Sequence, residues 1–224
     1  MTTTQLQPIT HVSFSGGLDS TAALQHAIDL NGADNVRAVS IDYGQRHRRE
    51  LDSASSIIRK LHVEWAVLDL KGVMRGSALL GEGDVPHGHY AAESMAATVV
   101  HGRNLLFAAA LIAHARPGDE VWLGVHAGDH HVYPDCRPEF IEHLTATAAT
   151  YDVAVRAPWV HMTKADIVAA EPTAPYELTW SCYKGGELHC GKCGTCVERA
   201  EAFALAGVPD PTTYETAEFW LVNP

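Results

Sequence analysis

Two adjacent glycines stand in the first strand-to-helix turn that the sequence predicts, and this turn constrains the fold more than any other feature. A β-prone segment at residues 11–14 runs into the hexapeptide Ser15-Gly16-Gly17-Leu18-Asp19-Ser20, and an alanine-rich helical pattern follows at once. Glycines permit a sharp turn and let backbone N–H groups approach a ligand closely. The helix that follows directs unpaired N–H donors and partial positive charge at the same place. The hexapeptide therefore predicts an anion cradle of phosphate size, although a capped glycine turn is the simpler alternative.

The order of the predicted elements indicates an α/β fold. Strands and helices alternate along the chain, which predicts a parallel, doubly wound sheet with helices on both faces. Ligands of such sheets bind at the carboxyl ends of the strands, where the glycine loop and residues 43–47 both lie. Residues 71–101 show no clear periodicity, as is typical of a functional lid or a disordered segment. We expect strands at 36–42, 63–70, 120–125 and 153–158, and helices at 20–30, 48–61, 103–115, 139–151 and 163–170, the last capped by Thr163.

The composition favours an enzyme with a small substrate. The length of 224 residues suits one domain with a small appendage, and 46% hydrophobic residues is ordinary for a soluble globular protein. The first ten residues lack a signal-peptide pattern, and no apolar run approaches the ~18 residues that span a bilayer. We therefore expect a cytoplasmic protein without membrane contact. The net charge of −11 argues against stable nucleic-acid binding, which needs a basic surface.

Four of the five cysteines crowd together near the C-terminus, at Cys182, Cys190, Cys193 and Cys196. A cytosolic chain does not need a disulfide framework there, whereas C-x2-C turns present sulfurs to a tetrahedral zinc ion. We expect a closed structural zinc site, with His189 as a possible competing ligand. The sequence thus predicts two units: a nucleotide-binding α/β domain over residues 1–178, and a zinc-binding C-terminal subdomain over 179–224 packed on it.

Other polar residues are weaker candidates. Asp129 and Asp135 could bind magnesium or substrate, but ordinary capping and loop roles fit their spacing equally well. Arg103 opens a helix after the irregular segment, where it could reach phosphate or a purine edge or simply be solvated. Lys164 lies near a helix N-terminus, where the helix dipole disfavours a cation and so hints at an anionic partner. Cys136 lies apart from the cysteine cluster and is predicted to be packed or close to the substrate.

The hexapeptide resembles the pyrophosphate loop, S-G-G-x-D-S, of the ATP pyrophosphatases that activate substrates by adenylation. Further segments resemble, more narrowly, the 7-cyano-7-deazaguanine synthases of the queuosine pathway. The likeness runs from residue 14 to about residue 214 and departs at residues 171–174, where we expect a slightly longer helical connection in the family. The segments that carry it are 14–20, 42–47 (DYGQRH), 100–107, 124–140 (GVHAGDHHVYPDCRPEF), 163–166 and 175–201, which includes the cysteines.

This resemblance implies a reaction, its cofactors and its residues. The reaction is conversion of 7-carboxy-7-deazaguanine and ammonia to the nitrile preQ0, with ATP, Mg²⁺ and Zn²⁺ as cofactors and a homodimer as the expected assembly. The implied catalytic residues are Ser15, Asp19, Ser20, Arg46, Arg103 and Lys164. The implied nucleotide site consists of Phe14, Ser15, Gly16, Gly17, Leu18, Asp19, Ser20, Thr21, Ala22, Ala23 and Leu24. The implied substrate residues are Tyr43, Gln45, Arg103, Asp129 and Asp135, whose carboxylates would accept from the guanine-like face.

Two alternatives stay open at the level of the sequence. Another adenylating enzyme with the same loop, such as a tRNA-thiolating enzyme, would normally need a reactive cysteine pair near the loop, and only Cys136 lies outside the cluster. A zinc-ribbon nucleic-acid binder would account for the cysteines, but the acidic charge and the loop count against it. The sequence does not indicate where the ammonia comes from, or whether the product serves tRNA or DNA.

Overall fold

A parallel five-stranded sheet forms the centre of the computed structural model, which describes residues 7–45, 48–81, 83–217 and 221. The strand order is β3-β2-β1-β4-β5, and every neighbouring pair is parallel. The chain builds outward from β1 to one side and then returns to add β4 and β5 on the other, so the order reverses beside β1. Open α/β sheets bind ligands at this switch point. The strands are β1 (Thr10–Ser13), β2 (Val36–Asp42), β3 (Glu64–Asp69), β4 (Glu120–Trp122) and β5 (Ala154–Arg156).

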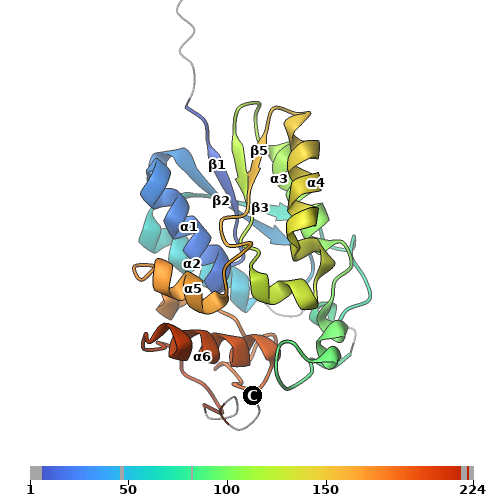
Figure 1. Cartoon of the computed structure of the whole chain (residues 1–224), viewed down its shortest axis with the longest axis vertical. Coiled ribbons are helices and arrows are strands. Elements are labelled where there is room, and N and C mark those ends of the chain that lie inside the picture. The colour runs from blue at the N-terminus through green and yellow to red at the C-terminus, as the bar shows by residue number, and fades with distance from the viewer. Residues whose placement is uncertain (1–6, 46–47, 82, 218–220, 222–224) are drawn as a thin grey trace, which may run out of the picture.

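Helices cover both faces of the sheet, which confirms the predicted fold class (Figure 1). On one face lie α1 (Leu18–Asn31), α2 (Arg49–Leu61) and α5 (Lys164–Ala170), and on the other lie α3 (Arg103–His114) and α4 (Pro138–Ala149). The last helix, α6 (Gly194–Ala206), lies below the carboxyl ends of the strands and packs on α5. The short 3-10 helices are Ala33–Asn35, Ala78–Leu80, Glu93–Thr98, Ala127–His131, Pro134–Cys136 and Tyr176–Leu178.

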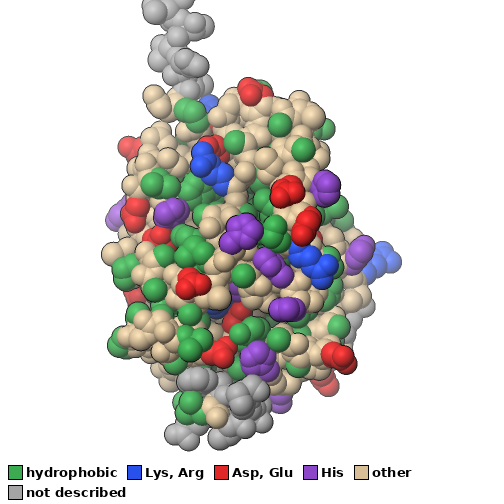
Figure 2. All heavy atoms as spheres, in the orientation of Figure 1, with side chains coloured by type: hydrophobic (Ala, Val, Ile, Leu, Met, Phe, Trp, Pro, Cys, Tyr) green, Lys and Arg blue, Asp and Glu red, His purple; other side chains and the backbone are tan. Residues whose placement is uncertain are grey.

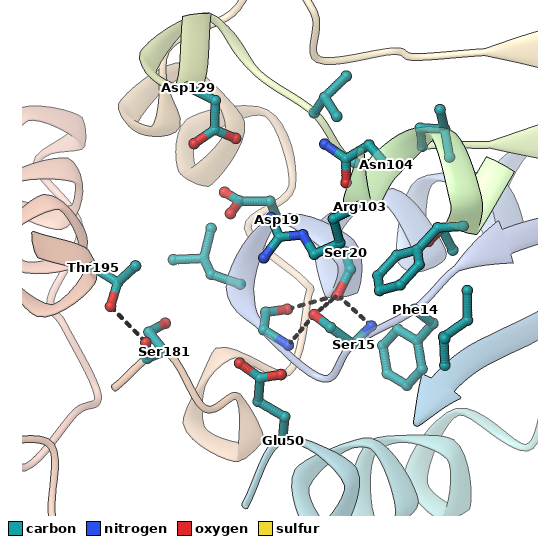
Figure 3. A pocket seen from close by; sticks show the side chains of 18 of the residues that line it. Phe14, Ser15, Asp19, Ser20, Glu50, Arg103, Asn104, Asp129, Ser181 and Thr195 are labelled. Carbon is teal, nitrogen blue, oxygen red and sulfur yellow. Dashed lines mark hydrogen bonds between the residues drawn. The ribbon is translucent and has the colours of Figure 1, made fainter. Parts of the chain in front are cut away.

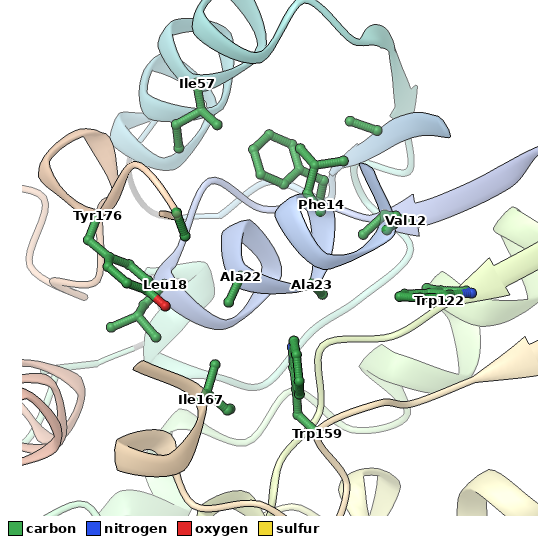
Figure 4. Close-up of a cluster of buried hydrophobic side chains, with 14 of the residues drawn as sticks. Val12, Phe14, Leu18, Ala22, Ala23, Ile57, Trp122, Trp159, Ile167 and Tyr176 are labelled. Carbon is green, nitrogen blue, oxygen red and sulfur yellow. The ribbon is translucent and has the colours of Figure 1, made fainter. Parts of the chain in front are cut away.

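The core on the α1 face is built from small residues against large ones. Ala22 and Ala23 of α1 are fully buried, so the helix backbone lies close to the sheet. Trp122 of β4, Ile57 of α2 and Ile167 of α5 fill the space around it (Figure 4). A core of this kind needs no strongly amphipathic helix, because α1 is covered on most of its sides.

The second core lies between the sheet and the other helix pair. Its buried residues come from both the sheet and the helices. They include Val39 and Ile41 of β2, Val121 of β4, Leu111 of α3 and Leu144 of α4. Ala38 lies in the first core while Val39 lies in the second. This alternation explains why residues 36–42 read as a continuous apolar strand, since a central parallel strand is buried on both faces.

The predicted elements match the structure most closely where local signals are strong. Thr163 caps α5 as expected: its hydroxyl accepts from Asp166 N–H at 3.2 Å, and the Asp166 carboxylate accepts from Thr163 N–H at 2.9 Å. The strands predicted at 120–125 and 153–158 are shorter, ending at Trp122 and Arg156. The described part of residues 71–101 contains two short 3-10 helices and an isolated bridge between His87 and Cys193.

One stretch, Glu93–His114, is long and apolar enough by composition to cross a membrane. It is not a single helix, because the 3-10 helix ends at Thr98 and α3 begins at Arg103. A charged guanidinium therefore stands in the middle of the stretch, and it lines the cavity described below.

Candidate active site

The turn after β1 has the shape that the two glycines predict. Gly16 has φ +86°, a left-handed conformation that side chains rarely adopt, and a Cβ atom there would collide with the backbone of Glu50 and Ala54 in α2. Gly17 is the N-cap of α1 and offers no side-chain cap to the first N–H groups of the helix. The positive end of α1 is thus open to an anion.

The hydroxyl of Ser20 ties this loop together. It accepts from Ser15 N–H at 3.2 Å, donates to Gly17 O at 3.2 Å and lies 3.1 Å from Ser15 Oγ (Figure 3). Ser15 Oγ in turn accepts from Gly17 N–H at 3.1 Å. These bonds hold the loop in one shape, so its donors need little rearrangement when a ligand binds.

A cavity of about 210 Å³ opens in front of the loop, at the carboxyl ends of β1, β2 and β4. It brings together residues from many separate segments of the chain, several of them singled out from the sequence. The predicted site residues that line it are Phe14, Ser15, Gly17, Leu18, Asp19, Ser20, Tyr43, Gln45, Arg103, Asp129 and Lys164.

Other predicted residues do not line this cavity. Gly16 is the loop residue that lies against α2 and not toward the cavity. Four further residues are buried in the packing of α1: Thr21, Ala22, Ala23 and Leu24. The carboxylate of Asp135 accepts from Asn104 N–H at 2.8 Å, so it caps the start of α3. Arg46 lies outside the described residues.

Lys164 is buried beside the loop with two carboxylates. Its Nζ lies 2.5 Å from Glu198 Oε2 and 3.3 Å from Asp19 Oδ2. Burial opposes the charge, but Asp19, Glu198 and Asp129 outweigh it and raise the pKa of Lys164. Two anionic side chains of the protein therefore already lie beside Lys164.

His126 stands behind the same carboxylates. Its Nδ1 accepts from Gly128 N–H at 3.1 Å, and its Nε2 lies 3.5 Å from Asp129, 3.7 Å from Glu198 and 3.8 Å from Asp19. Burial would lower the pKa of His126, but these carboxylates outweigh it and raise the pKa. The acidic side of the cavity is thus held by one lysine and one histidine.

The opposite wall is aromatic and apolar. Tyr43 and Phe107 have ring centroids 5.3 Å apart, and the Arg103 guanidinium lies 5.8 Å from the Tyr133 ring centroid. Cys136 is buried at this wall, and its thiol accepts from Asn104 Nδ2 at 3.1 Å. Burial raises the pKa of Cys136, which keeps it a neutral thiol.

Several lining residues were missed from the sequence. The segment around the cysteines closes one side of the cavity, where Thr195 Oγ1 donates to Ser181 O at 2.6 Å. For the missed residues of this segment, the only signal in the sequence was their place within residues 175–201, which carry the resemblance, and Glu50 had no such signal. The missed residues include Glu50, Trp180, Ser181, Tyr183, Thr195 and Glu198.

The four clustered cysteines are all buried, and their Sγ atoms lie within 4.8 Å of one another. A tetrahedron with metal–sulfur distances of 2.3 Å would separate the sulfurs by about 3.8 Å. Lys192 N–H and Cys193 N–H donate to Cys190 Sγ at 3.4 and 3.3 Å, which favours a thiolate. His189 is engaged elsewhere, since its Nε2 accepts from Ser181 N–H at 3.1 Å. The cluster can hold a metal ion.

The chain is similar in sequence to a known family and to named relatives in it. The family model of queuosine biosynthesis protein QueC matches residues 10–207. A 7-cyano-7-deazaguanine synthase of Rhizobium meliloti is 50% identical over 228 residues, spanning 95% of this chain and 94% of the relative. The synthase of Brucella ovis is 49% identical, spanning 94% and 95%. A solved glutamine-dependent NAD+ synthetase of Acinetobacter baumannii, in complex with ADP, shares 17% identity and a TM-score of 0.36 over 62% of this chain and 28% of its own. By the family match and the identity to these relatives, the chain belongs to the queuosine biosynthesis protein QueC family.

Proposed function

We propose that this chain is a 7-cyano-7-deazaguanine synthase, which forms preQ0 from 7-carboxy-7-deazaguanine and ammonia at the expense of ATP. The observation that carries the proposal is the cavity, which joins a lysine-free pyrophosphate-type loop to an aromatic wall suited to a planar base. Relatives that are half identical over nearly their whole length carry this name.

The chemistry explains why a nucleotide is needed twice. A carboxylate is a poor electrophile, because it is negative and its leaving group would be oxide. Attack of its oxygen on the α-phosphorus of ATP releases pyrophosphate and leaves AMP as a good leaving group. Ammonia then displaces AMP, with loss of one proton, to give the amide. Attack of the amide oxygen on a second ATP releases pyrophosphate again, and loss of AMP and the remaining N–H protons gives the nitrile.

The loop residues are assigned to the phosphates. Ser15, Ser20 and the open N-terminus of α1 would hold the β and γ phosphates and stabilise the departing pyrophosphate. Asp19 Oδ1 is buried without a hydrogen-bond partner in the described part of the chain, so it would be available to Mg²⁺. Bound there, Mg²⁺ would share the charge of the phosphates.

The remaining assignments rest on position in the cavity. Tyr43 and Gln45 would contact the deazapurine, and Arg103 would balance the carboxylate or a phosphate. Lys164 would keep Asp19 in place. The four clustered cysteines would bind one structural Zn²⁺, because a closed thiolate set leaves no open position for catalysis.

We further propose a cytoplasmic homodimer that does not bind nucleic acid stably. The net charge is −11, and on the face shown in Figure 2 the lysine and arginine side chains are scattered among acidic ones. A tRNA-thiolating activity is disfavoured because the one cavity thiol, Cys136, has a raised pKa and is not a ready nucleophile.

Product analysis tests the proposed function. Incubation with 7-carboxy-7-deazaguanine, ATP, Mg²⁺ and ammonium should yield AMP and pyrophosphate, with the amide appearing before the nitrile in the mass spectrum. Formation of ADP and phosphate as the main nucleotide products would rule out adenylation. Adenylation without any amide or nitrile, at saturating ammonium, would point to a different acceptor.

A further inference from the structure

One carboxylate in the cavity stands apart from the others. Glu50 lies in the first turn of α2, and its side chain points toward the space in front of the phosphate loop (Figure 3). Among the described residues it makes no side-chain hydrogen bond and no ion pair within 4.0 Å. A carboxylate oxygen has room for two hydrogen bonds, so this side chain has acceptor capacity that the described residues leave unused.

Each of the other cavity carboxylates has at least one charged partner. Asp19 and Glu198 share the ammonium group of Lys164, and Asp129 lies 3.5 Å from His126 Nε2. Asp135, which the sequence made a candidate for the substrate face, caps α3. Glu50 is therefore the cavity carboxylate with the most freedom to accept donors from a ligand.

The surroundings of Glu50 oppose its ionisation when the cavity holds no substrate. Burial raises the pKa of Glu50 to about 7, and the charge of Arg103 offsets this only in part. The other titratable side chains that line this part of the cavity are Tyr43 after β2, Asp19 of the loop and Tyr183 of the cysteine segment. A ligand with hydrogen-bond donors would compensate the lost solvation, whereas an anionic ligand group would be repelled.

The neighbours of Glu50 define what kind of ligand this would be. Tyr43 and Phe107 form the aromatic wall, and the electrostatic effect of Glu50 extends to Tyr43. A planar heterocycle against this wall would turn an edge toward Glu50. The pyrimidine ring of a 7-deazaguanine offers two parallel donors on one edge, N1–H and the 2-amino group, which match the two oxygens of a carboxylate.

We propose that Glu50 is the specificity-determining residue that accepts the N1–H and 2-amino donors of the substrate. The assignment rests on the proposed function for the identity of the substrate. It leaves the acidic cluster around Lys164 to the nucleotide side of the cavity and places base recognition at the start of α2.

Discrimination against a substrate analogue without the 2-amino group tests the proposal. A site built to bond a polar edge rejects an analogue that lacks it by about 10⁴-fold. We expect wild type to show a loss of at least about 10³-fold in kcat/KM for the analogue. In Glu50→Ala this ratio should collapse to less than about tenfold, because both substrates then lack the partner. The matched control is Asp52→Asn, which removes an exposed acidic group from the same first turn of α2 and should keep the wild-type ratio.

The ratio of kcat/KM for the substrate to kcat/KM for the analogue separates a role of Glu50 in recognition from a role in proton transfer. If Glu50→Ala slows both substrates by the same factor and keeps the wild-type ratio, Glu50 acts on the reacting nitrogen and the proposal is wrong. Calorimetric binding of 7-deazaguanine and of its analogue without the 2-amino group, measured without ATP, provides the same ratio independently of turnover. A wild-type enzyme that discriminates in binding but makes no nitrile would overturn the proposed function and leave the role of Glu50 supported.

The pH dependence of 7-deazaguanine binding provides a measurement that a purely structural role of Glu50 would not affect. Because the donors need an ionised acceptor, binding of 7-deazaguanine should strengthen as pH rises through about 7, and this dependence should vanish in Glu50→Gln. Glu50→Gln should also melt at a higher temperature than wild type at pH 8, since it removes a charge from a half-buried, poorly solvated position. A lower melting temperature together with unchanged binding would show that Glu50 serves the fold.

Discussion

A single hydroxyl, that of Ser20, fixes the geometry of the phosphate loop. It accepts from the N–H of Ser15, before the glycine pair, and donates to the carbonyl of Gly17, the second glycine. It therefore determines the direction in which the N–H groups of the turn point. Donors that are fixed before the reaction stabilise developing charge without a cost of reorganisation. Ser20 thus acts mainly through the loop backbone, in addition to any contact that it makes itself.

Ser20→Ala should lower the rate of ATP–pyrophosphate exchange by about 10²-fold, the usual effect of removing one preorganised donor. The melting temperature should fall by no more than about 4 °C, because only weak neutral hydrogen bonds are lost. Steady-state kinetics measures the exchange rate, and calorimetry measures the melting temperature. Thr145→Ala, which removes a comparable hydroxyl from exposed α4, is the control and should change neither. Equal losses in both variants would argue against the assignment.

At the scale of elements, one buried carboxylate joins two segments, the turn before β4 and the start of β1, at the amino end of the sheet. Asp119, in the turn before β4, accepts from Ile9 N–H at 2.9 Å and from Arg116 N–H at 3.0 Å, and it lies 3.1 Å from His11 Nε2 in β1. Burial alone would raise the pKa of Asp119, but Arg116, these backbone N–H groups and His11 hold it well below its usual range. The pKa of His11 is lowered, chiefly by burial.

Asp119→Asn should destabilise the protein by about 2–3 kcal/mol at pH 7, because charge-assisted bonds to a buried group are lost. A carboxylate with a depressed folded-state pKa contributes stability above its unfolded pKa of about 3.9 and loses it as pH falls toward the folded value. The difference in melting temperature between variant and wild type should therefore narrow progressively below pH 4. A constant difference from pH 7 to pH 3 would contradict the ionised network.

Local signals predicted the elements well and their ends less well. The Gly16-Gly17 turn, the strand at residues 36–42 and the Thr163 cap are each specified by neighbours in the chain, and the structure confirms them. β4 stops at Trp122 although the apolar run continues: Leu123 N–H still donates to Arg156 O of β5 at 2.9 Å, and the side chains of Leu123 and Val125 line the cavity. No pattern within residues 120–125 distinguishes these two uses of an apolar side chain.

At the scale of the whole molecule, the C-terminal segment completes both the core and the cavity. Phe203 of α6 packs in the same apolar cluster as Ile167 of α5, across the domain boundary that the sequence predicts after residue 178. Ser181, Thr195 and Glu198 from this segment line the cavity. Their role could not be read from the sequence, because it depends on how the segment folds back beneath the strand ends. Whether residues 179–224 form a separate unit stays a prediction.

Cys190→Ser should lower the metal content and the melting temperature together, because metal binding at such a site contributes directly to folding. Elemental analysis should find about one zinc per wild-type chain and substantially less in the variant. Cys136→Ser is the matched control: it removes a buried thiol outside the cluster and should keep the metal. Wild type that is metal-free, with a Cys190→Ser variant that melts like it, would refute a structural zinc site.

The cysteine cluster and the cavity share a segment of the chain, so binding at one can affect binding at the other. Ser181 lies next to Cys182 and Thr195 next to Cys196, two of the cysteines proposed to bind zinc, and both Ser181 and Thr195 line the cavity. If metal retention orders these residues, it strengthens nucleotide and substrate binding, and by reciprocity bound nucleotide and substrate must strengthen metal retention by the same factor. If the cluster holds zinc, chains with bound substrate would thus lose the ion to a chelator more slowly than chains without it, and a shortage of zinc would deplete the substrate-free chains first.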